Sequence, residues 1–150
     1  MRVVIQRVNH CSVFIDDKLY SSIGYGILVL LAIEEEEKIE DLEWLVSKCL
    51  NLRIFADADK TMHRSVKDIH GEVMIISQFT LFASTKKGNR PSFTKSAKPE
   101  YAKKLVELFI STFRQNYGGK VEEGFFGADM SIELVNNGPV TIVIDTKIKE

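Results

Sequence analysis

Two short segments combine polar side chains with backbone features that could act on a substrate. The first is Ser77-Gln78-Phe79-Thr80, which directly follows the apolar run at residues 73–76. Polar groups that continue a buried strand must find partners or take part in chemistry. A strand end where hydroxyl groups cap loose backbone groups explains the pattern as well as a reactive site does.

The second segment contains Gly138-Pro139, between two runs that alternate apolar and polar residues as strands do. Glycine reaches backbone conformations that other residues avoid, and proline lacks an amide donor and is confined to strand edges or first positions. An Asn-Gly turn alone would join two strands. The Gly-Pro pair therefore predicts a specialised backbone course, and the pattern leaves open what it contacts.

Three further residues have two interpretations each. Gln6 and Arg7 are neighbours in a strand-like stretch, so their side chains point to opposite faces and one of them must face inward or into a cleft. An inward Arg7 would clamp carbonyl or carboxylate groups, whereas an outward one would be solvated. Phe126, in "GFFGADM", is either a core residue or a platform on which a base stacks.

The histidines and cysteines match no familiar catalytic or metal site. His10, His63 and His70 have no metal-ligand spacing, and the sequence contains no G-x-S-x-G nucleophile motif. We therefore expect surface or capping histidines and no metal. Cys11 and Cys49 are too few and too isolated for a disulfide framework, so we expect reduced thiols in the core.

A basic segment follows the first polar motif. Residues 85–104 hold seven basic residues and one acidic residue, in a chain of net charge −1. A local basic loop on an otherwise acidic protein suits contact with one polyanion, because phosphate contacts supply affinity without regard to sequence. A solvated loop explains the same charges. If a nucleic acid binds here, Lys86, Lys87 and Arg90 are the expected contacts.

The composition is that of one globular domain over residues 1–150, with 45% hydrophobic and 27% charged residues. The longest apolar run, at residues 26–33, is too short to span a membrane. The N-terminal stretch lacks a signal-peptide layout, so we expect a cytoplasmic protein. No βαβ unit carries a glycine-rich phosphate turn, and we expect no cofactor.

Hydrophobic periodicity predicts the elements that position these residues. Strands are expected at residues 2–16, 19–23, 25–33, 53–57 and 71–83, and on both sides of Gly138-Pro139. One helix is expected at residues 34–52 with Ile39 in its apolar stripe, and another from Pro99 to Gly118-Gly119 with Leu108 on its apolar face. This order indicates a single-domain α+β fold, with mixed or antiparallel curved sheets that are barrel-like and two covering helices.

The motifs together resemble those of the D-aminoacyl-tRNA deacylases, also called D-tyrosyl-tRNA deacylases. "SQFT" at residues 77–80 and "GPVT" at residues 138–141 are the most specific matches. "IQRV", "NRPSF" and "GFFGADM" match in the same order, so the resemblance covers the whole chain. Phe82 and Ala83 depart mildly from the family pattern, outside its polar residues.

The resemblance implies a substrate, a homodimer and a way to select chirality. Family members hydrolyse the ester between tRNA and a D-amino acid. The equivalent of Gly138-Pro139 is joined by a cis peptide bond and inserts from one subunit into the active site of its partner, with carbonyls facing the chiral centre. An L-side chain would collide with these carbonyls, whereas D-residues and glycine, including glycine mischarged on tRNA-Ala, would fit.

Two interpretations of the hydrolysis step follow from the resemblance. Thr80 could attack as a nucleophile, but no base with suitable spacing is visible to activate it. In the other interpretation, which we favour, the amides around Phe79 and Thr80 polarise the ester carbonyl and a water attacks with help from the ribose hydroxyl. The resemblance also implies binding roles for the remaining family-matched residues. Ser77 and Gln78 are expected to hold the substrate, and Arg7, with Gln6 beside it, is expected to brace the Gly-Pro segment. Phe126 is expected to stack on the terminal adenine, and Met130 to line the adenine pocket.

Two functions of other classes compete with this one. The chain could be a non-catalytic RNA-binding module that grips tRNA through its basic loop, or a serine or threonine esterase for small molecules. Incubation with D- and L-aminoacyl-tRNA separates the three, because the binder releases neither amino acid and the small-molecule esterase acts without RNA.

Overall fold

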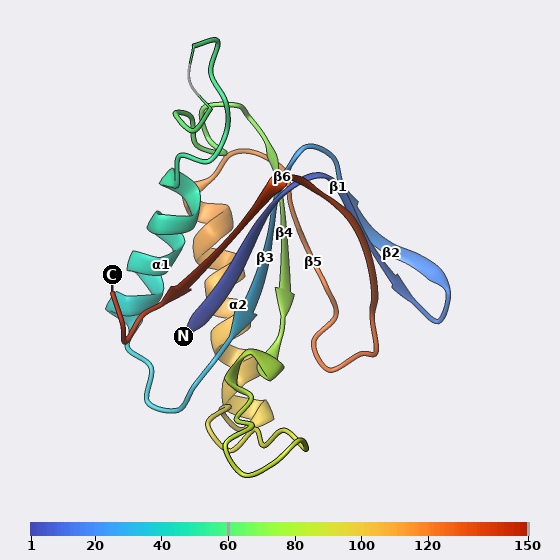
Figure 1. Cartoon of the computed structure of the whole chain (residues 1–150), viewed down its shortest axis with the longest axis vertical. Helices are drawn as coiled ribbons and strands as arrows, with labels where there is room; N and C mark the ends of the chain where they lie inside the picture. Colours follow the sequence, from blue (N-terminus) through green and yellow to red (C-terminus); the bar gives the residue numbers. More distant parts are fainter. Residues whose placement is uncertain (60, 150) are drawn as a thin grey trace.

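The computed structural model describes residues 1–59 and 61–149 and confirms the predicted α+β class (Figure 1). In this part of the chain, six strands form one mixed sheet and two α-helices pack side by side against it. The strands are β1 (Arg2–Ile15), β2 (Lys18–Ile23), β3 (Gly26–Ala32), β4 (Glu72–Ser77), β5 (Val121–Glu123) and β6 (Ser131–Asp145). The helices are α1 (Ile39–Asn51), α2 (Pro99–Asn116) and the short 3-10 helix η1 (Phe79–Phe82).

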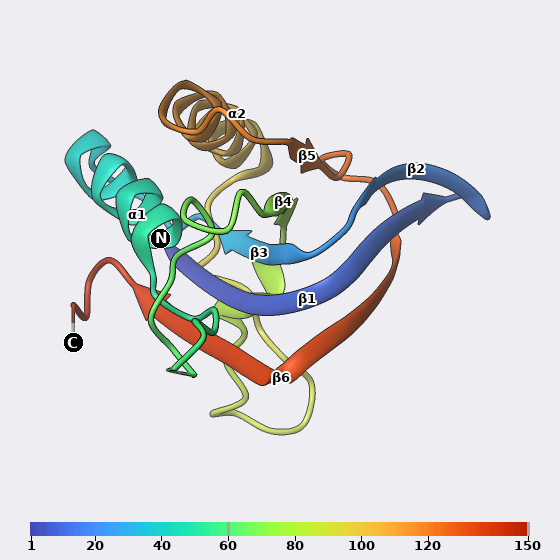
Figure 2. The same cartoon turned by 90° about the horizontal axis from the view of Figure 1, so that it is seen from above.

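The sheet is strongly curved, and β1 is its organising strand. The order is β2-β1-β3-β4-β5, with β6 also paired to β1. The pairs made by β1 are antiparallel, while β3, β4 and β5 are parallel to one another. Seen from above, β1 bends so that β2 approaches β5 (Figure 2). There the Ser21 hydroxyl donates to the Glu123 carbonyl at 2.9 Å, which gives the predicted barrel-like shape.

The two faces of the sheet bury separate hydrophobic cores. Successive residues of a strand point to opposite faces, and β3 is buried on both, which explains its unbroken apolar sequence. The larger core lies between the sheet and the helices and includes Val3, Ile5, Ile27, Val29, Leu45, Phe109 and Phe113. The smaller core lies inside the curve of the sheet and includes Val8, Val13, Leu28, Met74 and Ile76.

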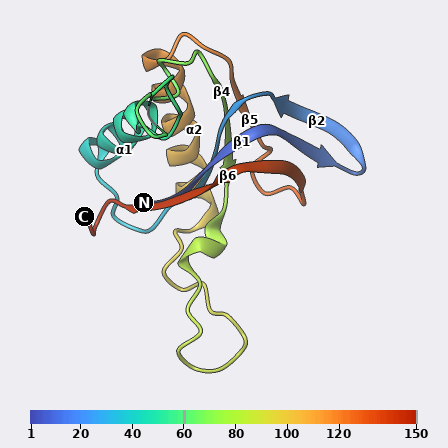
Figure 3. The ribbon, with the colours of Figure 1, turned by 45° about the horizontal axis from the view of Figure 1, so that its top comes forward.

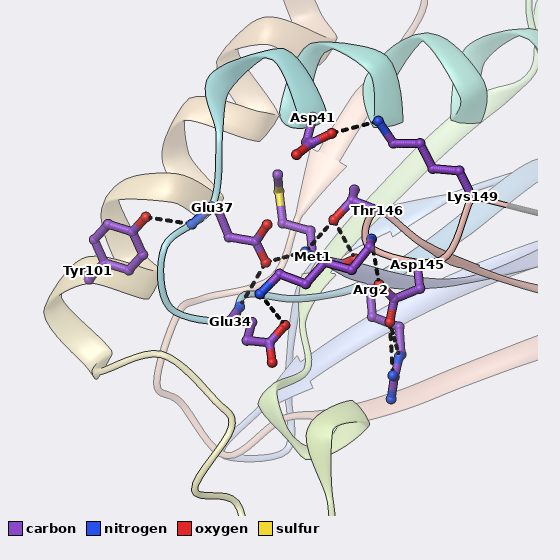
Figure 4. Close-up of polar contacts among 10 residues, drawn as sticks. Met1, Arg2, Glu34, Glu37, Asp41, Tyr101, Asp145, Thr146 and Lys149 are labelled. Atoms are coloured by element: carbon purple, nitrogen blue, oxygen red, sulfur yellow. Dashed lines mark hydrogen bonds and ion pairs between the residues drawn. The ribbon is translucent and has the colours of Figure 1, made fainter.

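The first helix begins later than the sequence predicts. The prediction of helix from residue 34 is wrong, because α1 begins at Ile39 and the acidic residues before it bind other parts of the chain. Glu37 binds the α-ammonium of Met1 (Figure 4). Glu34 forms an ion pair with Lys147 at 2.8 Å. This acidic turn therefore ties the two ends of the chain together before the helix starts.

Two residues that were predicted to lie on the buried apolar faces of the helices are exposed instead. Ile39 is 48% exposed because it is the first residue of α1, where the helix leaves the sheet. Leu108 is 38% exposed, since the buried face of α2 follows Leu105, Phe109 and Phe113. Pro99 occupies the start of α2 as predicted, where its missing amide costs no hydrogen bond.

Three strand predictions need correction. The strand predicted at residues 71–83 ends at Ser77, and the chain then turns into η1. The segment 53–57 contributes only an isolated bridge between Phe55 and Arg64. The two strands expected around Gly138-Pro139 are one strand, β6, whose pairing with β1 shifts register beside this pair. Among the described residues, no helix has the length and apolar character needed to cross a membrane.

Candidate active site

A cavity of about 650 Å³ opens where β4 ends. Its walls come from the end of β4, the start of η1, the N-terminal end of α2 and the segment that leads into β6. These elements meet at the lower end of the molecule in Figure 1. The residues from the sequence analysis that line it are Ser77, Gln78, Phe79, Phe126 and Met130. Residues far apart in the sequence thus share one cavity.

The end of β4 places two backbone donors beside this cavity. Ser77 is the last residue of β4 that pairs with β3, and the Gln78 amide still donates to the Leu31 carbonyl at 2.7 Å. The chain then turns, so the first amides of η1 have no preceding turn to bond to. Among the described residues, the amides of Phe79 and Thr80 have no hydrogen-bond acceptor. Two neighbouring donors are therefore left at the start of η1.

Side-chain contacts fix the conformation of η1. The side-chain amide nitrogen of Gln78, Nε2, donates to the Thr80 hydroxyl. Ser96 donates its hydroxyl to the Phe79 carbonyl at 3.0 Å, and the Phe79 ring packs edge-on against Phe93 with centroids 5.0 Å apart. In the part of the chain that the structure describes, no carboxylate or imidazole is hydrogen-bonded to Thr80. The geometry thus supplies amide donors but no base for a threonine nucleophile.

Phe93 and Ser96 are cavity residues that the sequence analysis did not single out as site residues. Phe93 closes the "NRPSF" segment, which was used only as a family match. Ser96 lies in the basic stretch of residues 85–104, where the sequence pattern is dominated by charged residues. Their closeness to "SQFT" depends on how the loop folds back, and no local sequence pattern reports that contact.

The Gly138-Pro139 segment is held from its own chain by Arg7. The guanidinium is half-buried, donating from Nε to the Asn137 carbonyl at 3.0 Å and from Nη1 to the Ile54 carbonyl, so it is a clamp on carbonyl groups. Gly138 has φ +130°, and a Cβ there would lie 2.7 Å from Arg7 Nη2. Only glycine therefore fits this close approach. Gly138 and Pro139 are exposed, and the peptide bond between them is cis.

This segment and the cavity lie toward opposite ends of the sheet. Across the sheet, Arg7 of β1 pairs with Ile27 of β3, which pairs with Val73 near the start of β4. Ser77 is the last residue of β4. The four residues from Val73 to Ser77 span about 13 Å along the strand. Gln6 accompanies Arg7, and its side chain donates to the Thr141 hydroxyl at 3.2 Å. One chain therefore does not bring the two motifs together.

The basic loop extends from the cavity end of the molecule. It is closed by a pair of backbone hydrogen bonds between Ser84 and Ser92, and it projects away from the body in Figure 3. Lys86, Lys87 and Arg90 are all exposed on it. Because Phe93 lines the cavity just after this loop, the positive charge lies beside the cavity mouth.

Metal and thiol chemistry have no support in this geometry. Within residues 1–59 and 61–149, no three His, Cys, Asp or Glu side chains group as a metal site would require. Both cysteines are buried and free. Burial raises the pKa of the Cys11 thiol to about 11 and that of Cys49 to about 12, so both stay protonated near neutral pH and are poor nucleophiles.

Comparison with known proteins identifies the family. The model for D-Tyr-tRNA(Tyr) deacylase matches residues 4–145. The chain belongs to this family. It is 54% identical to the D-aminoacyl-tRNA deacylase of Flavobacterium psychrophilum and 53% identical to that of Bacteroides thetaiotaomicron, and each match covers all of both chains.

A solved structure shares the family fold closely. The structure titled "c-Myc DNA Unwinding Element Binding Protein" superimposes with a TM-score of 0.92 at 39% identity, over 97% of this chain and 98% of that one. These matches confirm the predicted family, the fold and an enzyme that hydrolyses ester bonds.

Proposed function

We propose that this protein hydrolyses the ester bond of D-aminoacyl-tRNA, releasing free tRNA and the D-amino acid, and spares L-aminoacyl-tRNA. The observation that carries the proposal is the pair of unpartnered amides, Phe79 and Thr80, at the start of η1, where Phe79 lines the cavity. These amides support the proposal independently of the names of the relatives. Backbone amides that bond a developing oxyanion suit the hydrolysis of an ester.

In the proposed reaction, the ester carbonyl accepts hydrogen bonds from the amides of Phe79 and Thr80. Water attacks the polarised carbon and the ribose oxygen leaves, taking up the proton that the water loses. The neighbouring ribose hydroxyl assists this transfer. Thr80 is not the nucleophile, because its hydroxyl accepts from Gln78 and no described base is bonded to it.

The cavity would take the terminal adenosine of the tRNA. Phe126 is half-buried with its ring at the cavity wall, where it would stack on the base, and Met130 would line the same pocket. Ser77 and Gln78 would hold the aminoacyl end beside η1. The exposed Lys86, Lys87 and Arg90 would bind phosphates of the acceptor stem from outside the cavity.

Chirality would be selected by a second copy of the chain. Gly138 and Pro139 are exposed and far from the cavity of their own chain, so they would reach a substrate only in a partner. In a homodimer, each copy would place this segment, braced by Arg7 and Gln6, over the aminoacyl group of the other. Carbonyls there would exclude L-side chains but admit D-residues and glycine, so glycyl-tRNA-Ala would also be a substrate, in the cytoplasm during translation quality control.

The deciding experiment measures deacylation of one tRNA charged with a D-amino acid, its L-enantiomer or glycine. We expect rapid release of the D-residue and glycine and little release of the L-residue. Binding without release of any amino acid would indicate an RNA-binding module. Hydrolysis of small esters at the same rate with and without RNA would indicate a small-molecule esterase, and either outcome would overturn the proposal.

A further inference from the structure

Arg2, which has no role in the proposed reaction, connects the first strand to the helix η1. Its guanidinium contacts β6 and η1 at once. Nε and Nη2 lie 3.0 and 2.9 Å from Asp145 Oδ2, and Nη1 donates to the Leu81 carbonyl at 2.8 Å. The guanidinium carbon also lies 4.8 Å from the centre of the Phe82 ring. Figure 4 shows the contact between Arg2 and Asp145, which are neighbours across β1 and β6.

The contact with Leu81 matters because η1 has few hydrogen bonds of its own. The helix has only four residues, and its last carbonyls lack partners within it. Arg2 supplies a partner for the Leu81 carbonyl, while Ser96 supplies one for the Phe79 carbonyl. The positive charge of Arg2 near the last residues of η1 also compensates the partial negative charge of the carbonyl groups there, which is favourable.

Holding carbonyl groups also orients amides, because each peptide unit is planar. The Phe79 carbonyl and the Thr80 amide belong to one rigid unit and point in opposite directions. Holding the Phe79 carbonyl through Ser96 therefore directs the Thr80 amide to the other side, while Arg2, at the Leu81 carbonyl, fixes the far end of the same four-residue helix.

We propose that Arg2 is a positioning residue, which fixes η1 so that the amides of Phe79 and Thr80 are aimed at the substrate carbonyl. The proposal rests on the proposed function of those amides. It predicts an effect on the chemical step rather than on tRNA binding. Asp145 has a supporting part, since its carboxylate holds the guanidinium through two nitrogens and leaves the third free for Leu81.

The contacts of Arg2 can be removed without dismantling the strand that carries it. The side chain is 32% exposed, so its loss leaves no large internal cavity. The backbone at the start of β1 is held separately, since the Thr146 amide donates to the Met1 carbonyl at 2.9 Å. Loss of the guanidinium should therefore loosen η1 while leaving the sheet in place.

The test compares Arg2→Lys and Arg2→Gln with Lys149→Met as a matched control. Lys149 forms a nearby ion pair with Asp41 at 2.7 Å, and no contact joins it to η1 within the described residues. We expect both Arg2 variants to lower kcat by about tenfold to 100-fold with KM for the D-aminoacyl-tRNA unchanged, as misplaced catalytic groups do. Lys149→Met should keep the wild-type kcat.

A second measurement does not depend on activity. Hydrogen exchange of the Leu81 and Ala83 amides, which donate to the Gln78 and Thr80 carbonyls, should be faster in both Arg2 variants than in the wild type and in Lys149→Met. Wild-type kcat and exchange in both folded Arg2 variants would overturn the proposal. If the wild type released no amino acid but the Arg2 variants still loosened η1, the proposed function would fail while the contact of Arg2 with η1 would stand.

Discussion

The two ends of the sheet carry two different kinds of functional surface. At the end of β4 the chain leaves the sheet, and η1 presents two free amides beside a cavity. At the other end the chain stays in β6, and Gly138-Pro139 forms an exposed segment fixed from behind by Arg7. One end offers donors and a cavity, and the other offers a rigid backbone with no cavity. Each lacks what the other has.

In the proposed function, each chain therefore supplies two complementary halves of a site rather than a whole site. A catalytic group needs to be within hydrogen-bond reach of the reacting atoms, and the two halves lie on rows about 13 Å apart along the strand. An isologous homodimer brings such halves together twice, because each surface meets the partner's opposite surface. The following predictions test whether the halves differ in role as their geometry implies.

The largest effect should come from removing one amide donor. Phe79→Pro deletes the N–H at the first position of η1, where the fixed φ of proline is tolerated. Phe79→Ala keeps the N–H and loses the ring, which makes it the matched control. We expect kcat on D-aminoacyl-tRNA to fall by about 100-fold to 1,000-fold in Phe79→Pro, the cost of one oxyanion donor. If kcat fell equally in Phe79→Ala, loss of the ring rather than of the N–H would explain the effect.

The opposite end should control discrimination more than rate. In Gly138→Ala a Cβ would lie 2.7 Å from Arg7 Nη2 and the φ of +130° would be strained, so the guanidinium that braces the segment, the segment itself or both must shift. We expect the ratio of D to L rates to fall by about tenfold or more, because the carbonyls shift from their position over the substrate. Gly118→Ala is the control, since nothing lies within 4 Å of its added Cβ. If folded Gly138→Ala kept the wild-type ratio of D to L rates, this segment would not be the element that selects chirality.

A smaller effect should appear in the binding of tRNA. Reversing Lys86, Lys87 and Arg90 to glutamate should weaken tRNA binding and make its dependence on salt shallower, since fewer counterions are released. Turnover of bound substrate should stay near the wild-type rate, because these side chains lie on an exposed loop outside the cavity. An unchanged salt slope would place the acceptor stem elsewhere.

The smallest effect should follow loss of the Thr80 hydroxyl. Thr80→Ala keeps the backbone amide and removes the hydroxyl that accepts from Gln78, together with one methyl group. We expect it to retain a substantial part of the wild-type kcat in single-turnover measurements. A fall to the uncatalysed rate in a folded protein would instead make Thr80 the nucleophile.

The sequence predicted most of the fold but not how its segments turn. Apolar periodicity located β1 and α2, and the unbroken apolar run located β3, which is buried on both faces. It failed at residues 34–37 and 78–83, where chain direction depends on distant partners such as Met1, Leu31 and Arg2. Local propensity contains no information about those contacts.

The candidate site was predicted unevenly for the same reason. Ser77, Gln78 and Thr80 stood out because polar residues follow a buried run, and the structure places Ser77 and Gln78 at the cavity wall. Arg7 had two open interpretations, which only its contacts with the Asn137 and Ile54 carbonyls decide. The separation of Gly138-Pro139 from the cavity depends on strand register, which the sequence does not display.

A mixture of two impaired variants shows whether the site is shared between two chains. Each homodimer of Phe79→Pro or of Gly138→Ala should be impaired, the first in kcat and the second in selective hydrolysis. In a mixed dimer, the intact η1 of the Gly138→Ala chain would face the intact Gly138 of the other chain. Random pairing of equal amounts should then restore selective D-aminoacyl-tRNA hydrolysis to about a quarter of wild type, as expected for a two-fold symmetric dimer. No recovery in a preparation shown to contain mixed dimers would contradict a site shared between two chains.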